Sequence, residues 1–159
     1  MSRYKVSIII PCYNEEQNLP GCLESIERLD FPNKDIEVIV VDNGSDDASQ
    51  QIAKDHGLKV LIDKNLHVSG LRNLGAKQAS GDILAFIDAD CYVDREWLKN
   101  ASRYFGQEDV VAWGSPPAVP ENATWVQDTW FIVRKLEKPI QEVSWLESMN
   151  LFVRTKDFL

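Results

Sequence analysis

The fold is decided by one short stretch of the chain, Gly81-Asp-Ile-Leu-Ala-Phe-Ile-Asp-Ala-Asp90. Its apolar run, residues 83–87, is typical of a buried strand in a parallel sheet that other elements cover on both faces. The run ends at Asp88 and Asp90, so two carboxylates stand where the core meets solvent. Open parallel sheets bind ligands at the carboxyl ends of their strands, and we therefore expect a binding site here.

Short apolar runs alternate with helical patterns on both sides of this stretch, which predicts an α/β fold with a mostly parallel central sheet. We predict strands at residues 6–10, 36–41, 58–62, 83–87, 110–113 and 150–153. We predict helices at residues 19–29, 45–54, 69–79 and 123–137, and one that begins after Asp94. Asn14 and Ser45 are placed to cap the first two of these helices.

Composition bounds the class of protein. The chain has 159 residues, which predicts a single domain over 1–159, and its 17 Lys and Arg against 25 Asp and Glu give a net charge of -8. This balance argues against a protein that binds duplex nucleic acid, which needs a basic face. The three cysteines are too few for a disulfide framework or a zinc site, and no signal peptide opens the chain. We therefore expect a cytoplasmic protein.

Polar clusters directly follow three of the predicted strands, at residues 11–15, 42–47 and 88–90. Each cluster alone fits a turn or a helix cap. All three belong to the same edge of a parallel sheet, however, and this shared placement predicts a ligand site rather than a solvated surface.

The chemistry of that edge favours a divalent cation. Asp88 and Asp90 offer the hard oxygen ligands that Mg²⁺ and Mn²⁺ take, usually together with substrate phosphates. Without a metal, a diphosphate beside bare carboxylates would meet about 4 kcal/mol of repulsion per close charge pair at an effective dielectric constant of about 20. The phosphate-binding motifs G-x-x-x-x-G-K-[ST] and G-x-G-x-x-G are both missing from the sequence.

The chain resembles the family 2 glycosyltransferases of the GT-A type over residues 4–159. The resemblance is carried by Val6-Ser-Ile-Ile-Ile-Pro-Cys-Tyr-Asn-Glu15, Val40-Val-Asp-Asn-Gly-Ser-Asp-Asp47, Arg72-Asn-Leu-Gly75, Gly81 to Asp90 as quoted above, and Met149-Asn-Leu-Phe-Val-Arg154. It implies a Rossmann-like GT-A fold, an α/β/α sandwich. It also implies metal-dependent transfer of a sugar, with inversion, from a nucleotide-diphosphate sugar to an acceptor hydroxyl.

The resemblance also implies roles for single residues on the nucleoside side. Pro11 and Tyr13 would line the pocket of the base, and Glu15 would border the nucleoside. Asp42 would accept a hydrogen bond from the base. The alternative for Tyr13 is packing in the core.

On the phosphate side, the resemblance implies that Arg72 lies near the base or the phosphates. Asp88 would bind the ribose or support the metal, and Asp90 would ligate Mg²⁺ or Mn²⁺ that bridges the diphosphate. The alternative for Arg72 is a structural ion pair with Asp42 or Asp88.

The family's general base lies beyond the stretch that corresponds to residues 150–154, so we expect it after Leu159 and interpret the chain as truncated before it. The implied acceptor is a saccharide or a lipid-linked sugar of cell-envelope polysaccharide synthesis, with peripheral contact at the inner face of the membrane. The predicted helix 123–137 would pack in the core, form an acceptor-side wall or touch a membrane. Two other functions remain open, a non-catalytic nucleotide-sugar-binding module and a nucleotidyltransferase.

Overall fold

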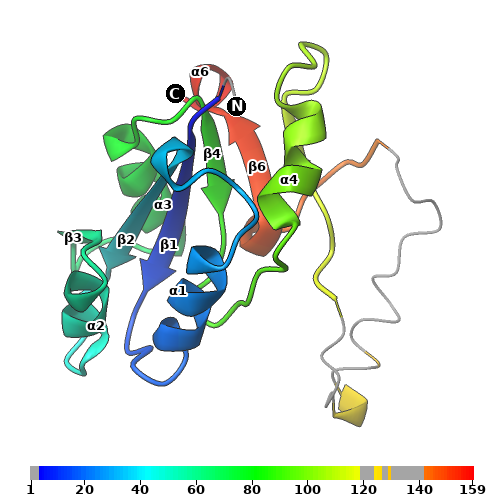
Figure 1. Ribbon diagram of the computed structural model, residues 1–159. Coiled ribbons are helices and arrows are strands. Elements are labelled where there is room, and N and C mark those ends of the chain that lie inside the picture. The colour runs from blue at the N-terminus through cyan, green and yellow to red at the C-terminus, as the bar shows by residue number, and fades with distance from the viewer. Residues whose placement is uncertain (1–3, 119–123, 127–128, 130–141) are drawn as a thin grey trace.

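The computed structural model describes residues 4–118, 124–126, 129 and 142–159. Its strands form a sheet in the order β3-β2-β1-β4-β6-β5 (Figure 1). Their bounds are Val6–Cys12 for β1, Ile36–Asp42 for β2, Lys59–Ile62 for β3, Ile83–Phe86 for β4, Ala112–Gly114 for β5 and Leu151–Arg154 for β6. The six predicted strands are therefore confirmed, with ends that differ by a few residues.

The pairing of the strands brings the carboxyl ends of β1, β2, β3 and β4 to one edge. β1 pairs in parallel with β2 and β4, and β2 pairs in parallel with β3, whereas β6 runs antiparallel to both β4 and β5. The expectation of a mostly parallel sheet is confirmed. In the register of β1 and β2, Cys12 lies opposite Asp42, so the polar clusters that follow these strands start side by side.

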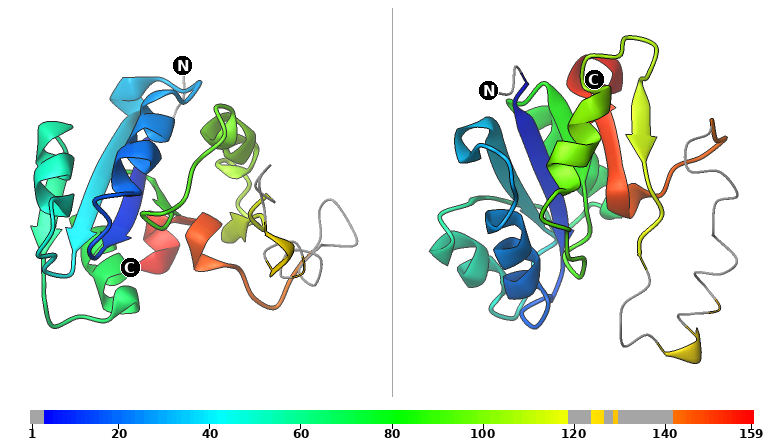
Figure 2. Two further views of the ribbon diagram at one scale, coloured as in Figure 1. Left: turned by 90° about the horizontal axis from the view of Figure 1, so that it is seen from below. Right: turned by 45° about the vertical axis from the view of Figure 1, so that its right-hand side comes forward.

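Helices cover both faces of the sheet (Figures 1 and 2). They are α1 (Leu19–Glu27), α2 (Ser49–Asp55), α3 (Val68–Gln78), α4 (Trp97–Ala101) and α6 (Thr155–Phe158), with 3-10 turns at Asn33–Asp35, Ser102–Tyr104 and Ser148–Asn150. Alternate side chains of β1 point to opposite faces. Ile8 and Ile10 pack with residues of α1, α2 and α4, and Ile9 packs with residues of α3. The three-layer α/β/α arrangement is confirmed.

Two predicted helix caps are wrong, and the reason is tertiary. The N-cap of α1 is Asn18, and α2 begins only at Ser49. The side chains of Asn14 and Ser45 instead make hydrogen bonds between two loops, which are described below. Short polar side chains can satisfy backbone N–H groups of a helix or of a neighbouring loop, and sequence spacing alone does not distinguish the two.

The predicted helix 123–137 falls almost entirely outside the described residues. Within the part of the chain that is described, the helices are too short and too polar to cross a lipid bilayer.

Candidate functional site

A cavity of about 260 Å³ opens at the edge where β1, β2 and β4 end. It is lined by Pro11, Cys12, Tyr13, Glu15, Asn43, Val68, Leu71, Arg72, Asp88, Ala89 and Asp90. Sequence reasoning selected most of the polar lining residues, from segments that are far apart along the chain. The fold brings these residues together because parallel strands end at a common edge.

Four segments supply the lining, and each is fixed by its strand or helix; the one after β2 contributes Asn43, which is described below. The end of β1 contributes Pro11, and the loop after it contributes Tyr13 and Glu15. The first turns of α3 contribute Arg72, and the chain after β4 contributes Asp88 and Asp90. The ring of Tyr13 is 57% exposed, so it is not packed in the core and presents an apolar face at the cavity.

Asp42 lies outside the lining, although the family resemblance implied a contact with a base. The residue is fully buried. Its Oδ1 accepts hydrogen bonds from the backbone of Gly44 (2.8 Å) and Ser45 (2.9 Å) and from the side chain of Gln50 (2.8 Å), and its Oδ2 accepts one from the Ser45 hydroxyl (2.5 Å). Asp42 therefore holds the turn after β2, and its contact with a base stays a prediction.

Asn43 lines the cavity; it belongs to the predicted cluster 42–47, but sequence reasoning missed its individual role. Its Nδ2 donates hydrogen bonds to the carbonyl oxygens of Asp63 (2.7 Å) and Leu66 (2.9 Å). A carbonyl oxygen can only accept, so both contacts must come from the NH₂ group and the orientation of the amide is unambiguous. The remaining polar atom, Oδ1, is an acceptor on a side chain that cannot turn freely. The signal was masked because Asn before Gly is the ordinary composition of a turn.

Arg72 and Asp88 form an ion pair through Nη2 and Oδ1, so the alternative of an ion pair for Arg72 is confirmed with Asp88 as the partner. The guanidinium is largely buried, with 13% of the side chain exposed. Its Nε is buried and has no hydrogen-bond partner among the described residues. Arg72 is the cation of a lining that also carries Glu15, Asp88 and Asp90, which leaves the cavity acidic.

Gly75 allows α3 to bring Arg72 this close to the strand ends. A Cβ atom at Gly75 would lie 2.5 Å from Cγ2 of Ile9 and 3.0 Å from Cγ2 of Val41. Contacts under about 3 Å are not tolerated in close-packed cores, so a side chain here would push α3 away from the sheet. The glycine of the Arg72-Asn-Leu-Gly75 stretch therefore has a packing role.

The residues at the cavity fit a divalent cation only if a ligand completes its coordination. Asp90 is exposed, and the contact found for its carboxylate is the Cys91 thiol at 3.7 Å. Within the described ranges, no group of three or more His, Cys, Asp and Glu side chains is arranged to hold a metal. Mg²⁺ and Mn²⁺ are commonly bound by one or two carboxylates plus substrate phosphates, and this cavity offers such an incomplete oxygen set.

The cysteines near the cavity are structural. All three are free thiols, and Cys12 and Cys22 are buried. Burial raises the pKa of Cys12 to about 12 and that of Cys91 to about 11. A thiolate is the reactive form of cysteine, so these side chains are protonated at neutral pH and do not act as nucleophiles.

Comparisons with known proteins agree on one family. The sequence profile of Glycosyl transferase family 2 matches residues 7–155. The glycosyltransferase AglE of Haloferax volcanii is 35% identical over 159 residues, which cover 94% of this chain and 52% of AglE. The chain thus spans about half the length of this curated relative.

Solved structures of glycosyltransferases resemble the fold, and two of them illustrate the likeness. The mannosyltransferase PcManGT of Pyrobaculum calidifontis, in complex with GDP-Man and Mn²⁺, superposes with a TM-score of 0.74 at 23% identity over 97% of this chain and 45% of that one. Residues 1–349 of S. aureus TarS, in complex with UDP-GlcNAc, superpose with a TM-score of 0.66 at 24% identity over 95% of this chain and 45% of that one. At these identities both likenesses concern the fold.

Proposed function

The chain belongs to glycosyl transferase family 2, and we propose that its cavity binds a nucleotide-diphosphate sugar together with Mg²⁺ or Mn²⁺. The bound donor would pass its sugar to an acceptor hydroxyl with inversion. One observation carries the proposal: an exposed aromatic ring, a buried guanidinium and an exposed carboxylate meet in one cavity at the carboxyl ends of parallel strands.

The nucleoside would lie at the β1 and β2 side of the cavity. The half-exposed ring of Tyr13 offers a face for a base, Pro11 adds apolar surface, and Glu15 would border the sugar of the nucleoside. The oriented Oδ1 of Asn43 is a suitable acceptor for an N–H group of the base. Asp42 would act indirectly, by holding the turn that carries Asn43, since its oxygens already accept four hydrogen bonds.

The diphosphate would lie at the β4 side. Arg72 carries a buried Nε that still lacks a partner, so its guanidinium has capacity for an anionic oxygen beyond Asp88. Asp90 would hold the metal ion, and Asp88 would orient Arg72 and support the ribose or the metal. A bound divalent cation supplies charge neutralisation on a departing nucleotide diphosphate.

The general base stays unassigned. The carboxylates that line the cavity, Glu15, Asp88 and Asp90, are all used on the donor side of the proposal. We propose that a carboxylate other than these three takes the proton of the acceptor hydroxyl. A saccharide or lipid-linked acceptor of the cell envelope, a cytoplasmic location and contact with the inner face of a membrane also remain predictions, and flotation with liposomes tests the last of them.

Calorimetric titration tests the donor site. We expect UDP, GDP or dTDP sugars to bind in the presence of Mn²⁺ and to lose binding after addition of EDTA. Asp90→Ala should abolish this binding, whereas Asp109→Ala, which removes an exposed carboxylate outside the cavity, should leave it unchanged. Tight donor binding that ignores the chelator would contradict the proposal.

The aromatic wall has its own test. Stacking of a base on an aromatic side chain contributes about 1–3 kcal/mol, so Tyr13→Ala should raise the donor Kd about tenfold. Tyr92→Ala, which removes another tyrosine that is more than half exposed and lies outside the lining, is the matched control. Release of free nucleotide diphosphate, measured with and without an acceptor, then separates a transferase from a non-catalytic binding module.

A further inference from the structure

Two loops at the cavity edge are joined to each other by hydrogen bonds that the donor-binding proposal does not use. One loop connects β1 to α1 and the other connects β2 to α2, where the two strands end side by side (Figure 1). We call Asn14, Glu16, Ser45, Asp47 and Ser49 the loop clasp.

The first half of the loop clasp pairs Asn14 with the opposite loop in both directions. The backbone N–H of Asn14 donates to Ser45 Oγ (2.9 Å), and Asn14 Oδ1 accepts from the backbone N–H of Asp46 (3.0 Å). Asn14 has a φ of 54°, in the left-handed region that Asn tolerates better than most residues with a Cβ. Both the side chain and the backbone conformation of Asn14 thus contribute to the contact between the two loops.

The second half of the loop clasp repeats this exchange two residues further along the β1–α1 loop, at Glu16. The backbone of Glu16 donates to Asp47 Oδ2 (3.0 Å), and Glu16 Oε2 accepts from the backbone of Ala48 (3.1 Å). Partial desolvation acts to raise the pKa of Asp47, but the hydrogen bonds that it accepts from Ser49 and Glu16 lower it by more. The pKa of Asp47 therefore lies below its ordinary value. Asp47 therefore stays ionised, and an acceptor, at neutral pH.

The loop clasp is anchored in the core on the β2 side. Ser45 Oγ, which receives the Asn14 N–H, donates its own proton to Oδ2 of the buried Asp42. Buried Ser49 accepts a hydrogen bond from the backbone of Glu15 (2.8 Å). A chain of hydrogen bonds therefore runs from a fixed carboxylate in the sheet to the backbone of the β1–α1 loop.

Residues next to this series of hydrogen bonds line the cavity. Asn14 is flanked by Tyr13 and Glu15, and Asn43 lies two positions before Ser45. The Tyr13 ring is 57% exposed, so core packing does not determine its place. Its backbone is continuous with that of Asn14, which the loop clasp holds through two hydrogen bonds.

We propose that Asn14 and Ser45 are positioning residues that hold the Tyr13 and Asn43 walls at the spacing a nucleoside base requires. The inference rests on the proposed donor site. It assigns the loop clasp to the base end of the donor and not to the diphosphate end, because Arg72, Asp88 and Asp90 come from α3 and β4, outside both loops. A clasp that only stabilised the fold would affect both ends alike.

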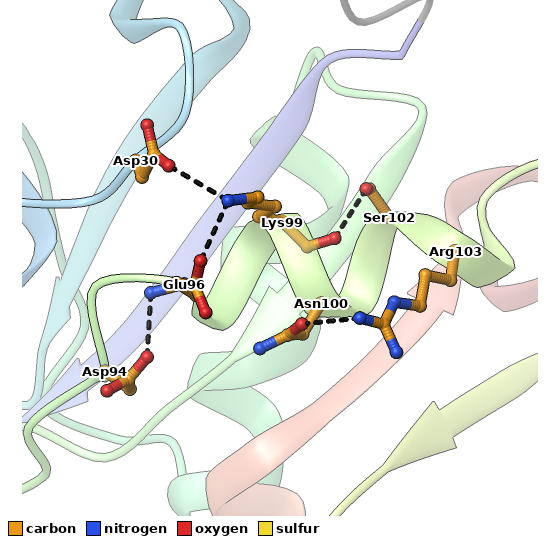
Figure 3. A network of polar contacts seen from close by, with 7 residues as sticks. All are labelled: Asp30, Asp94, Glu96, Lys99, Asn100, Ser102 and Arg103. Atoms are coloured by element: carbon orange, nitrogen blue, oxygen red, sulfur yellow. Dashed lines mark hydrogen bonds and ion pairs between the residues drawn. The ribbon is translucent and has the colours of Figure 1, made fainter.

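The test compares two ligands on the same variants. Asn14→Gly keeps the left-handed backbone but removes the acceptor oxygen, and Asn14→Asp keeps that oxygen. Ser45→Ala breaks the link to Asp42. Ser102→Ala, which removes a surface hydroxyl bonded within its own turn (Figure 3), is the control. Each variant is titrated with Mn²⁺ plus UDP, GDP or dTDP, and separately with Mn²⁺ plus inorganic pyrophosphate.

We expect Asn14→Gly and Ser45→Ala to raise the Kd of the nucleoside diphosphate about tenfold, the order expected when a hydrogen bond that organises the site is lost. The Kd of pyrophosphate should stay within about twofold, and Asn14→Asp should retain wild-type affinity for both ligands. Thermal melting confirms that each variant is folded, and Asn14→Gly carries the test if Ser45→Ala is not.

Equal weakening of both ligands, or an unchanged nucleoside diphosphate Kd in folded Asn14→Gly, would overturn the inference while leaving the donor site intact. A wild-type chain that binds neither ligand would instead overturn the proposed function, and the inference with it.

Discussion

The loop clasp and the surface of α4 are both rich in polar contacts, but they are built differently. On α4, Lys99 bridges Asp30 (3.3 Å) and Glu96 (2.8 Å), and Arg103 donates to Asn100 (3.2 Å) (Figure 3). The side chains of Lys99, Asp30 and Glu96 are each more than half exposed. These contacts join the ends of long side chains that solvent reaches from several directions.

In the loop clasp, mostly short side chains accept from backbone N–H groups. The hydrogen bonds of Asn14 and Glu16 are exposed, but two anchors, Asp42 and Ser49, are fully buried. A short side chain loses little rotamer freedom, and a buried acceptor that loses its donor is not rescued by water. Exposed ion pairs contribute little because they are screened and flexible. Networks of hydrogen bonds therefore mean a fixed geometry where buried groups anchor them, and a solvated surface where they join exposed charged side chains.

Removal of the buried Asp42 carboxylate should have the largest effect of the changes predicted for the two regions. Asp42→Ala leaves four donors without their acceptor, and we expect the free energy of unfolding to fall by about 3 kcal/mol. Urea denaturation measures the change. Asp30→Ala, on the α4 surface, should leave the unfolding midpoint nearly unchanged, and equal effects of the two substitutions would show that burial does not separate the regions.

Packing at the site edge provides the next test. Gly75→Ala places a Cβ atom 2.5 Å from Ile9, and overpacking of this kind costs about 1–3 kcal/mol. Because α3 would move, donor binding through Arg72 should weaken as well. Gly106→Ala, after α4, meets only the Tyr4 hydroxyl at 3.4 Å and should be neutral in both assays. A neutral Gly75→Ala would mean that α3 is not held against β1 as described.

The smallest effect is expected on the α4 surface itself. The pKa of Lys99 is raised, first by its hydrogen bond with Glu96 and then by that with Asp30, so the protonated form is favoured in the folded state. Any stability from this pairing is present below the ordinary lysine pKa and is lost as the pH rises through the raised value. At pH 7, Lys99→Met should therefore change the melting temperature only slightly, and 1 M NaCl should remove the difference. A large change that persists in salt would contradict the contrast.

The strands were predictable because runs rich in β-branched residues have few alternatives, and residues 6–10 and 36–41 each contain only one other residue, Ser7 and Glu37. Most of the cavity was predictable because parallel strands end together: Pro11 and Tyr13 follow the run 6–10, and Asp88 and Asp90 follow the run 83–87. The direction of each strand then fixes the place of the residues that come after it.

The loop clasp was not predictable from local patterns. Asn14 and Ser45 have the composition and spacing of helix caps, and only the pairing of β1 with β2 places each beside the other's backbone. Asn43 was missed for a related reason, because its role depends on carbonyl groups of the distant segment 63–66. These are contacts between segments, which periodicity does not encode.

The central claim is that the protein and a diphosphate share one divalent cation, and the affinity for Mn²⁺ tests it most directly. Mn²⁺ binding is measured calorimetrically with and without saturating nucleoside diphosphate, for wild type, Asp90→Ala and Asp109→Ala. We predict weak binding of Mn²⁺ alone, at least about tenfold tightening with the nucleotide, and loss of the tightening only in Asp90→Ala, because coupling between two ligands is reciprocal. Equal Mn²⁺ affinity with and without the nucleotide in the wild type would contradict the claim.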